Sequence, residues 1–320
     1  MWRKAVVALA FALAIPCSVI AQQARFPDRT IKIVVPFPPG GSPDISARFL
    51  AEALTKKWNA SFVVENVGGA AGAIGADQVA RAEPDGYTWL AGPNNVLIFN
   101  PLMGTGKYDT LRDFAPVSNL ISALNVVVVA EQLPIKSVAE LIAHAKANPG
   151  TLNFGTAGPG SPQDLSGRLL MKLADITMVP VAYRGISPLL PDLMTNRVQL
   201  TINPAAPVLS LVNEGKLRLL AGTGQKRYHA FPDLPAVAET VPEYNVDIWT
   251  GIVLPARAPP SIVASINAGI VEVMTTVEMR ERLKAVGLEP APTTPQAFAA
   301  LIREDLVRWR KVLDQPAAEK

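Results

Sequence analysis

The chain alternates between short apolar runs and longer stretches in which apolar residues recur every three or four positions. The first pattern predicts buried strands and the second predicts amphipathic helices. The predicted strands are 31–35, 62–65, 87–91, 125–130, 152–155, 179–183, 198–202, 217–221 and 248–254. Strands that alternate with helices of about 10–15 residues indicate βαβ units. We therefore predict an α/β protein with parallel sheets covered on both faces.

Helix starts are marked by capping residues. The Ser-Pro pairs at 42–43 and 161–162 each open a predicted helix, with serine as a capping residue and proline in the first turn. The sequence SVAE at 137–140 is a capping box, in which the serine hydroxyl accepts from a free N–H group and the glutamate reaches back. Three helical segments close the chain, and the last spans 294–313 with a threonine as its cap.

The first 21 residues have the layout of a secretory signal peptide. Positive charges at 3–4 precede an apolar run at 5–15, and residues 19–21 offer a cleavage point before Gln22. The run is shorter than the about 20 residues that a membrane span needs. We therefore expect residues 1–21 to be removed and the rest of the chain to be exported to the periplasm.

Composition narrows the classes of function. The single cysteine, Cys17, leaves with the predicted signal peptide, so the remaining 299 residues have neither disulfides nor a thiol nucleophile. Export without disulfides fits a bacterial periplasm, because an oxidising compartment permits disulfides without requiring them. Loss of the charges at 3–4 lowers the formal net charge from +3 to +1. That charge gives no basic footprint for nucleic acid, and we expect no nucleic-acid partner.

Five loops that follow predicted strands are rich in glycine, serine, proline or asparagine. They are 36–44 (PFPPGGSPD), 66–75 (NVGGAAGAIG), 91–95 (AGPNN), 155–164 (GTAGPGSPQD) and 183–188 (YRGISP). Ligands of open α/β sheets bind beyond the carboxyl ends of the strands, where helix N-termini present unpaired N–H groups. Each loop alone also fits ordinary helix initiation or close packing. Their number and shared position predict a cradle for carboxylates.

Catalytic patterns are absent from the sequence. His144 falls in a predicted helix and His229 in a long loop, and neither has a nearby serine and carboxylate arranged as a triad. The chain has no nucleophile elbow, no phosphate-binding loop and no dinucleotide fingerprint. We expect no catalytic residue, no cofactor and no metal site. A secreted enzyme acting on a carboxylated substrate stays open as an alternative, because distant residues can assemble a site.

The motifs PGG, GAAGAIGA, PDGYT, VAYRG and WTG resemble those of the substrate-binding proteins of tripartite tricarboxylate transporters, the Bug-type periplasmic receptors. The resemblance extends over essentially the whole chain after the signal peptide. It implies a fold like that of class II periplasmic binding proteins, with two α/β lobes, a ligand cleft between them and two crossing strands, for which 125–130 and 248–254 are the candidates. Lobe 1 would comprise 22–125 plus 250–320, and lobe 2 would comprise 126–249.

The resemblance also implies a function. Such a receptor captures a small carboxylated solute (a di- or tricarboxylate, an acidic amino acid or another organic acid) by hinge closure. It then delivers the solute to the membrane permease subunits of a tripartite tricarboxylate transporter. We expect a monomer. A module that presents its ligand to a membrane signalling system is the alternative.

Ligand contacts can be carried over by matching motif. The first lobe would contribute Phe37, Gly41, Ser42, Asp44, Ala71, Gly72, Pro93 and Asn94. The second lobe would contribute Thr156, Ala157, Gly160, Ser161, Tyr183 and Arg184. The chain departs from the family at Asp164, where a histidine is common, at Arg184, where a lysine is common, at Gln199, where an aspartate is frequent, and in the loop 92–95. The departures leave the identity of the ligand open.

Overall fold

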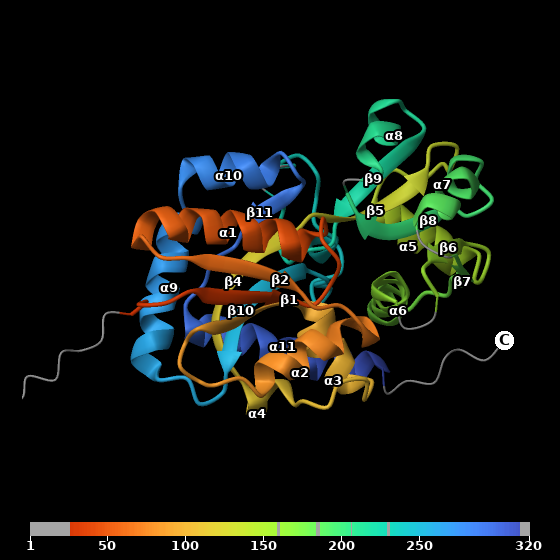
Figure 1. Cartoon of the computed structure of the whole chain (residues 1–320). Helices are drawn as coiled ribbons and strands as arrows, with labels where there is room; N and C mark the ends of the chain where they lie inside the picture. The colour runs from red at the N-terminus through yellow and green to blue at the C-terminus, as the bar shows by residue number, and fades with distance from the viewer. Residues whose placement is uncertain (1–25, 159–160, 184–185, 206, 229–230, 314–320) are drawn as a thin grey trace, which may run out of the picture.

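The computed structural model describes residues 26–158, 161–183, 186–205, 207–228 and 231–313. The predicted signal peptide and two predicted ligand contacts, Gly160 and Arg184, lie outside the described residues. Figure 1 shows two lobes side by side, each built on its own sheet with helices packed against it. The predicted two-lobed α/β fold is confirmed.

The sheet of the first lobe has six strands in the order β11-β4-β10-β3-β1-β2. These strands are β1 (Ile31–Val35), β2 (Phe62–Asn66), β3 (Thr88–Pro93), β4 (Phe114–Ala123), β10 (Ile248–Pro255) and β11 (Leu288–Pro290). β1 runs parallel to β2 and β3, whereas β10 runs antiparallel to β3 and β4. The sheet is therefore mixed, and the prediction of a wholly parallel sheet is wrong for its β4–β10 half.

The sheet of the second lobe has five strands in the order β7-β6-β8-β5-β9. These strands are β5 (Asn125–Ala130), β6 (Asn153–Thr156), β7 (Val179–Ala182), β8 (Leu200–Pro204) and β9 (Leu217–Gly222). β6 is parallel to β7 and β8, and β5 is antiparallel to β8 and β9. Both lobes thus join a parallel half to an antiparallel strand that leads toward the other lobe.

The helices begin close to the predicted capping residues. They are α1 (Ser42–Trp58), α2 (Ala73–Ala80), α3 (Asn100–Leu102), α4 (Thr110–Asp113), α5 (Val138–Ala147), α6 (Pro162–Ala174), α7 (Ile186–Met194), α8 (Leu209–Asn213), α9 (Pro260–Met274), α10 (Val277–Lys284) and α11 (Pro295–Leu313), with short turns η1 (Ala70–Gly72), η2 (Asn95–Phe99) and η3 (Val237–Glu239). The Ser137 hydroxyl accepts from Glu140 N–H at 3.1 Å, while Glu140 accepts from Lys136 N–H, one residue before the cap, at 2.8 Å. Over the described ranges, no single helix is long and apolar enough to cross a membrane.

The core of the first lobe lies on both faces of its sheet. Ile31, Ile33 and Val35 alternate along β1 and pack in the cluster that contains α1 and α9. The cluster on the opposite face holds α2 and α11 and continues into the second lobe, where Leu165 of α6 joins it with Trp309 of α11. α11 therefore packs against both lobes.

The chain passes between the two sheets at two places. β4 leads into β5 with only Leu124 between them. On the return, Val246 N–H donates to the Thr223 carbonyl beyond the end of β9 at 2.8 Å, and Ile248 already pairs with Ala123 in the first sheet. The second crossing therefore falls at Asp247 instead of within 248–254, because β10 pairs with first-lobe strands on both sides. The exact lobe boundaries stay a prediction.

β4 was not predicted, although it lies within the first sheet, between β11 and β10. Its sequence FAPVSNLISA contains Pro116, Ser118 and Asn119, which are typical of loops. In the structure the Ser118 hydroxyl donates to the Thr293 carbonyl at 3.0 Å, and Asn119 N–H donates to the Thr293 hydroxyl at 3.0 Å. Contacts with a residue about 175 positions away therefore satisfy the Ser118 hydroxyl and the Asn119 N–H group of this strand.

Candidate functional site

The N-terminus of α1 presents N–H groups that have no partner within the helix. Its cap, Gly41, has extended backbone angles (φ −79°, ψ 166°) and supplies no side-chain cap. The first intrahelical bond runs from Ile45 N–H to the Gly41 carbonyl at 3.0 Å, so the N–H groups of Ser42 and Asp44 have no partner within the helix. Within the described chain the Ser42 hydroxyl also makes no hydrogen bond. These groups and the positive end of the helix dipole favour a bound carboxylate.

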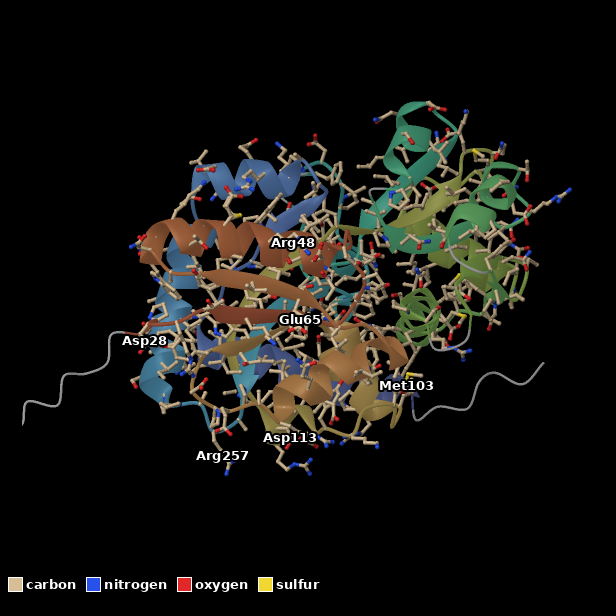
Figure 2. All side chains as sticks on the ribbon, viewed as in Figure 1. Asp28, Arg48, Glu65, Met103, Asp113 and Arg257 are labelled. Carbon is tan, nitrogen blue, oxygen red and sulfur yellow. The ribbon has the colours of Figure 1, made fainter. Side chains whose placement is uncertain are left out.

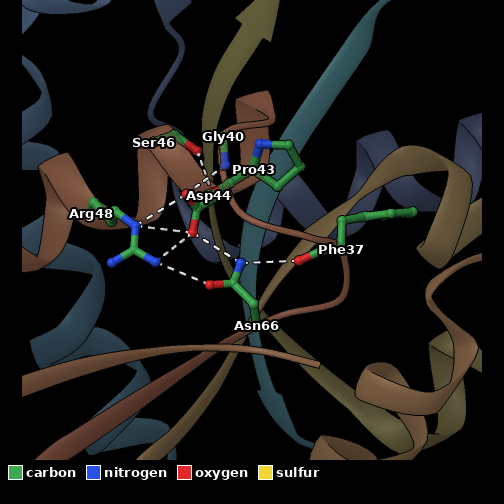
Figure 3. A network of polar contacts seen from close by, with 7 residues as sticks. All are labelled: Phe37, Gly40, Pro43, Asp44, Ser46, Arg48 and Asn66. Atoms are coloured by element: carbon green, nitrogen blue, oxygen red, sulfur yellow. Dashed lines mark hydrogen bonds and ion pairs between the residues drawn. The ribbon is translucent and has the colours of Figure 1, made fainter. Parts of the chain in front are cut away.

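The loop before α1 is held by Asp44, as Figure 3 shows. The Asp44 carboxylate accepts from Gly40 N–H at 2.9 Å, from Asn66 Nδ2 at 2.9 Å and from Arg48 Nε at 3.0 Å. Asn66 also donates to the Phe37 carbonyl at 3.0 Å. Burial acts to raise the pKa of Asp44, but the hydrogen bonds from Arg48, Gly40 and Asn66 outweigh it and hold the pKa below 3.8. The Asp44 carboxylate thus positions the loop, and ligand contact by Asp44 through its N–H group stays a prediction.

The turn before α2 forms the wall behind Phe37. Gly72 has φ +91°, and a Cβ atom there would stand 2.6 Å from Val96 Cγ2 and 3.1 Å from Phe37 Cζ. Only glycine therefore allows this close approach. The carbonyl of neighbouring Ala71 accepts from Asn100 Nδ2 at 3.0 Å. Gly72 thus packs against the aromatic ring, Asn100 holds the Ala71 carbonyl, and neither Ala71 nor Gly72 lines the cavity described next.

A cavity of about 270 Å³ lies where the two lobes meet. Its lining residues are Phe37, Ser42, Pro43, Pro93, Asn94, Asn95, Ile121, Ala123, Pro162, Ile248 and Thr250. Four predicted contacts, Phe37, Ser42, Pro93 and Asn94, are brought together here, and Pro162 comes from the second lobe. None of these lining side chains carries a charge. The cavity therefore offers neutral hydrogen-bonding groups beside the N-terminus of α1.

The cavity floor is the end of the first sheet. Thr250 of β10 pairs with Pro93 of β3 and Ile121 of β4, and Ile248 pairs with Ala123. Paired residues on neighbouring strands share a face, so these five residues form one surface. Most of this surface was not predicted from the sequence, because β4 was not predicted and 248–254 was assigned to the crossing. The Trp-Thr-Gly motif was the available signal, since Thr250 stands at its centre.

The start of α6 in the second lobe is capped by the Ser161 side chain. The Ser161 hydroxyl accepts from Asp164 N–H at 3.3 Å, and Ser161 N–H donates to the Gly158 carbonyl at 3.1 Å. Asp164 accepts from Arg168 Nε at 2.9 Å. Ser161 is therefore the predicted N-cap, and Asp164 forms an ion pair within its own helix.

The other second-lobe contacts lie away from the cavity in this arrangement. Thr156 is buried, and its hydroxyl accepts from Gly158 N–H at 3.0 Å. Tyr183 donates to Asp192 Oδ2 at 2.8 Å, and burial together with Asp192 raises the pKa of Tyr183 to about 12. Ala157 is exposed. Ligand contact by these residues stays a prediction.

The two ends of the first lobe differ in their relation to the second lobe. Figure 2 shows Arg48 and Glu65 at the end that faces the second lobe and Asp28 at the far end. The carboxyl end of β2 and the start of α1 therefore lie at the junction. Among the described residues, no group of three or more His, Cys, Asp or Glu side chains is placed to hold a metal ion.

Comparison with known proteins identifies the family. The model of the tripartite tricarboxylate transporter family receptor matches residues 46–317. Protein BugT of Bordetella pertussis is 34% identical over 92% of this chain and 91% of its own length. Rpa4515 of R. palustris, solved with adipate, has a TM-score of 0.70 at 34% identity and covers 90% of this chain and 97% of its own.

A TctC solute-binding protein from Polaromonas, solved with no ligand, has a TM-score of 0.82 at 26% identity. It covers 90% of this chain and 99% of its own. The chain therefore belongs to the tripartite tricarboxylate transporter receptor family, and it is a solute-binding receptor of the TctC and Bug type and not an enzyme.

Proposed function

We propose that this receptor captures a small carboxylated solute in the cavity between its lobes. The observation that carries the proposal is the uncapped N-terminus of α1, with its free N–H groups and the Ser42 hydroxyl, beside a neutral cavity of about 270 Å³. A carboxylate accepts hydrogen bonds from such groups without needing a cationic side chain. The adipate in Rpa4515 supports a carboxylated solute.

Capture would close the lobes about the two crossings. Of the residues that line the cavity, Pro162 alone belongs to the second sheet's side of the crossings. The overall likeness is higher to the unliganded Polaromonas protein (TM-score 0.82) than to adipate-bound Rpa4515 (0.70), although sequence identity runs the other way. A change in lobe orientation lowers a whole-chain superposition, so this order supports an open form here. A solute that contacts both lobes would favour the closed state.

The wider role follows the family. Members of this family are periplasmic receptors, and export of this chain through a cleaved signal peptide at 1–21 remains part of the proposal. The closed receptor would deliver its solute to the permease subunits of a tripartite tricarboxylate transporter. The two lobes would have different relative orientations in the open and closed forms, and a permease could recognise that difference.

Titration calorimetry against a panel of mono-, di- and tricarboxylates tests capture. Each acid is paired with its amide, for example succinate with succinamide, because the amide keeps the size and removes the charge. We expect at least one acid to bind and its amide to bind far more weakly. Small-angle scattering should then report a smaller radius of gyration with the bound acid. Equal binding of acid and amide would contradict capture at the α1 N-terminus, and unchanged scattering would contradict closure.

Uptake measurements test delivery. A strain that lacks the gene should take up the labelled acid more slowly than the complemented strain. Unchanged uptake together with altered transcription would favour a signalling role instead. The acid should also be recovered chemically unchanged after long incubation with the protein, as expected of a receptor.

A further inference from the structure

Thr250 is the one hydroxyl on the floor formed by Pro93, Ile121, Ala123, Ile248 and Thr250. Its side chain is 2% exposed and forms no hydrogen bond with any described residue. The Oγ1 atom is not one of the fully buried side-chain atoms that lack a partner, so it is reached from the cavity. A valine would have the same shape on this apolar surface but could not hydrogen-bond to a solute. The hydroxyl is therefore available to a group that enters the cavity.

The neighbouring amide of Asn94 has a fixed orientation. Asn94 follows Pro93, the cross-strand partner of Thr250, and is 6% exposed. Its Nδ2 atom donates to the Asp247 carbonyl at 2.9 Å. Because a carbonyl only accepts, the amide nitrogen must face Asp247, and Oδ1 is the atom left without a partner in the described chain. An acceptor and the Thr250 hydroxyl therefore belong to residues that line the same cavity.

We propose that Thr250 and Asn94 form a subsite for an uncharged hydroxyl group of the solute, so that the receptor selects hydroxy acids over the same acids without the hydroxyl. The inference rests on the proposed capture of a carboxylate. A solute hydroxyl can donate to Asn94 Oδ1 and accept from Thr250 at the same time. A carboxylate can only accept, so in this position it would face the Asn94 oxygen with no cationic side chain among the lining residues.

The two subsites would bind different groups of the same solute. The carboxylate would bind at Ser42 and the start of α1, where free N–H groups converge. The hydroxyl would bind at Thr250 and Asn94, on the floor of the same cavity. A site that has committed buried polar groups to a hydroxyl discriminates against an analogue that leaves those groups unpaired.

Calorimetry with matched pairs tests the subsite on the native receptor. The pairs are malate with succinate, citrate with tricarballylate, 3-hydroxybutyrate with butyrate, and 4-hydroxybenzoate with benzoate. In the pair that binds most tightly, we expect the hydroxy acid to bind at least about 10-fold more tightly, the equivalent of one hydrogen-bonded hydroxyl. Equal binding within that pair would overturn the subsite and leave carboxylate capture intact. Failure of every acid to bind would instead overturn the proposed function, and the subsite with it.

Two variants locate the preference. Thr250→Val keeps the β-branched shape and should weaken the hydroxy acid about 10- to 100-fold while changing its partner acid less than about threefold. Thr250→Ser keeps the hydroxyl and should preserve the preference. Ser42→Ala, as the control, should weaken both members of the pair alike. An equal loss for both acids in Thr250→Val would overturn the assignment, since it would indicate a packing effect only.

Discussion

The helices α1 and α6 begin in almost the same way on opposite sides of the lobe junction. Residues 44–48 and 164–168 both read Asp-x-Ser-x-Arg, and in each the aspartate pairs with the arginine one turn later. In each the serine hydroxyl donates to the carbonyl of the first-turn proline, at 3.1 Å in α1 and 2.5 Å in α6. The local sequence therefore repeats one helix start in both lobes.

The difference between them lies in the cap. Ser161 uses its own hydroxyl to satisfy Asp164 N–H, so the start of α6 is partly closed by its own side chain. Gly41 supplies no such group, and the loop before α1 is held by the buried carboxylate of Asp44 in the first turn of the helix. One residue at the cap can therefore decide whether the N–H groups at a helix start are paired by its own side chain or left open for a ligand.

The largest effect is expected from a side chain placed at the open cap of α1. Gly41→Val should abolish carboxylate binding, because the side chain would stand between the solute and the N–H groups of α1. The fold should survive, since a Cβ atom at Gly41 would meet only Pro43 Cδ at 3.7 Å. Calorimetry and thermal unfolding measure the two effects. Retained binding in a folded variant would show that the site is placed wrongly.

Asp44→Asn tests the hydrogen bonds that hold the loop before α1. The amide cannot accept from all of Gly40, Asn66 and Arg48, so we expect a loss of about 3 kcal/mol in unfolding free energy. Because the pKa of Asp44 is held below 3.8 in the folded state, its contribution is present above about pH 4 and is lost as the pH falls through the lowered pKa. Urea unfolding should therefore separate variant and wild type at pH 7 and bring them together at low pH. A constant difference across this range would contradict the role of the charge.

Asp247, at the second crossing between the lobes, should have the opposite effect on stability to Asp44 as the pH changes. Burial raises its pKa to about 6, against the attraction of Arg308. The unfolded carboxyl ionises near 3.8, so wild-type stability should fall as the pH rises from about 4 to 6 and stay reduced above that window. Asp247→Asn should remove the dependence and be more stable at pH 7 by on the order of 2 kcal/mol. A variant that keeps the wild-type pH profile would contradict this expectation.

The paired serines give the smallest and most direct comparison. Ser161→Ala removes a cap and should cost about 1 kcal/mol of stability. Ser42→Ala removes a hydroxyl that has no partner in the described chain, so stability should hardly change while carboxylate affinity falls about 10-fold. Equal stability losses in the two variants would mean that Ser42 is also a cap.

Much of the candidate site was predictable because it depends on local chemistry. The glycine-rich loop after β1 and the Ser-Pro pair at 42–43 predict a helix start near the ligand, and Phe37, Ser42, Pro93 and Asn94 line the cavity. Asp44 was read by the same reasoning as a ligand contact, yet its carboxylate is occupied by groups from β2 and its own loop. A first-turn aspartate looks the same in sequence whether it faces a ligand or a neighbouring strand.

The alternation of strands and helices, the bounds of β1 and β5, and the caps Ser137 and Ser161 follow from the sequence, because side-chain periodicity and capping act within a few residues. The predicted cap Ser42 is instead the first residue of α1, after the cap Gly41. The antiparallel pairing of β10, the existence of β4 and the cavity floor around Thr250 depend on the tertiary structure. Those features depend on pairing between segments more than 100 positions apart. Hydrogen bonds across such distances make a strand of residues whose local pattern reads as a loop.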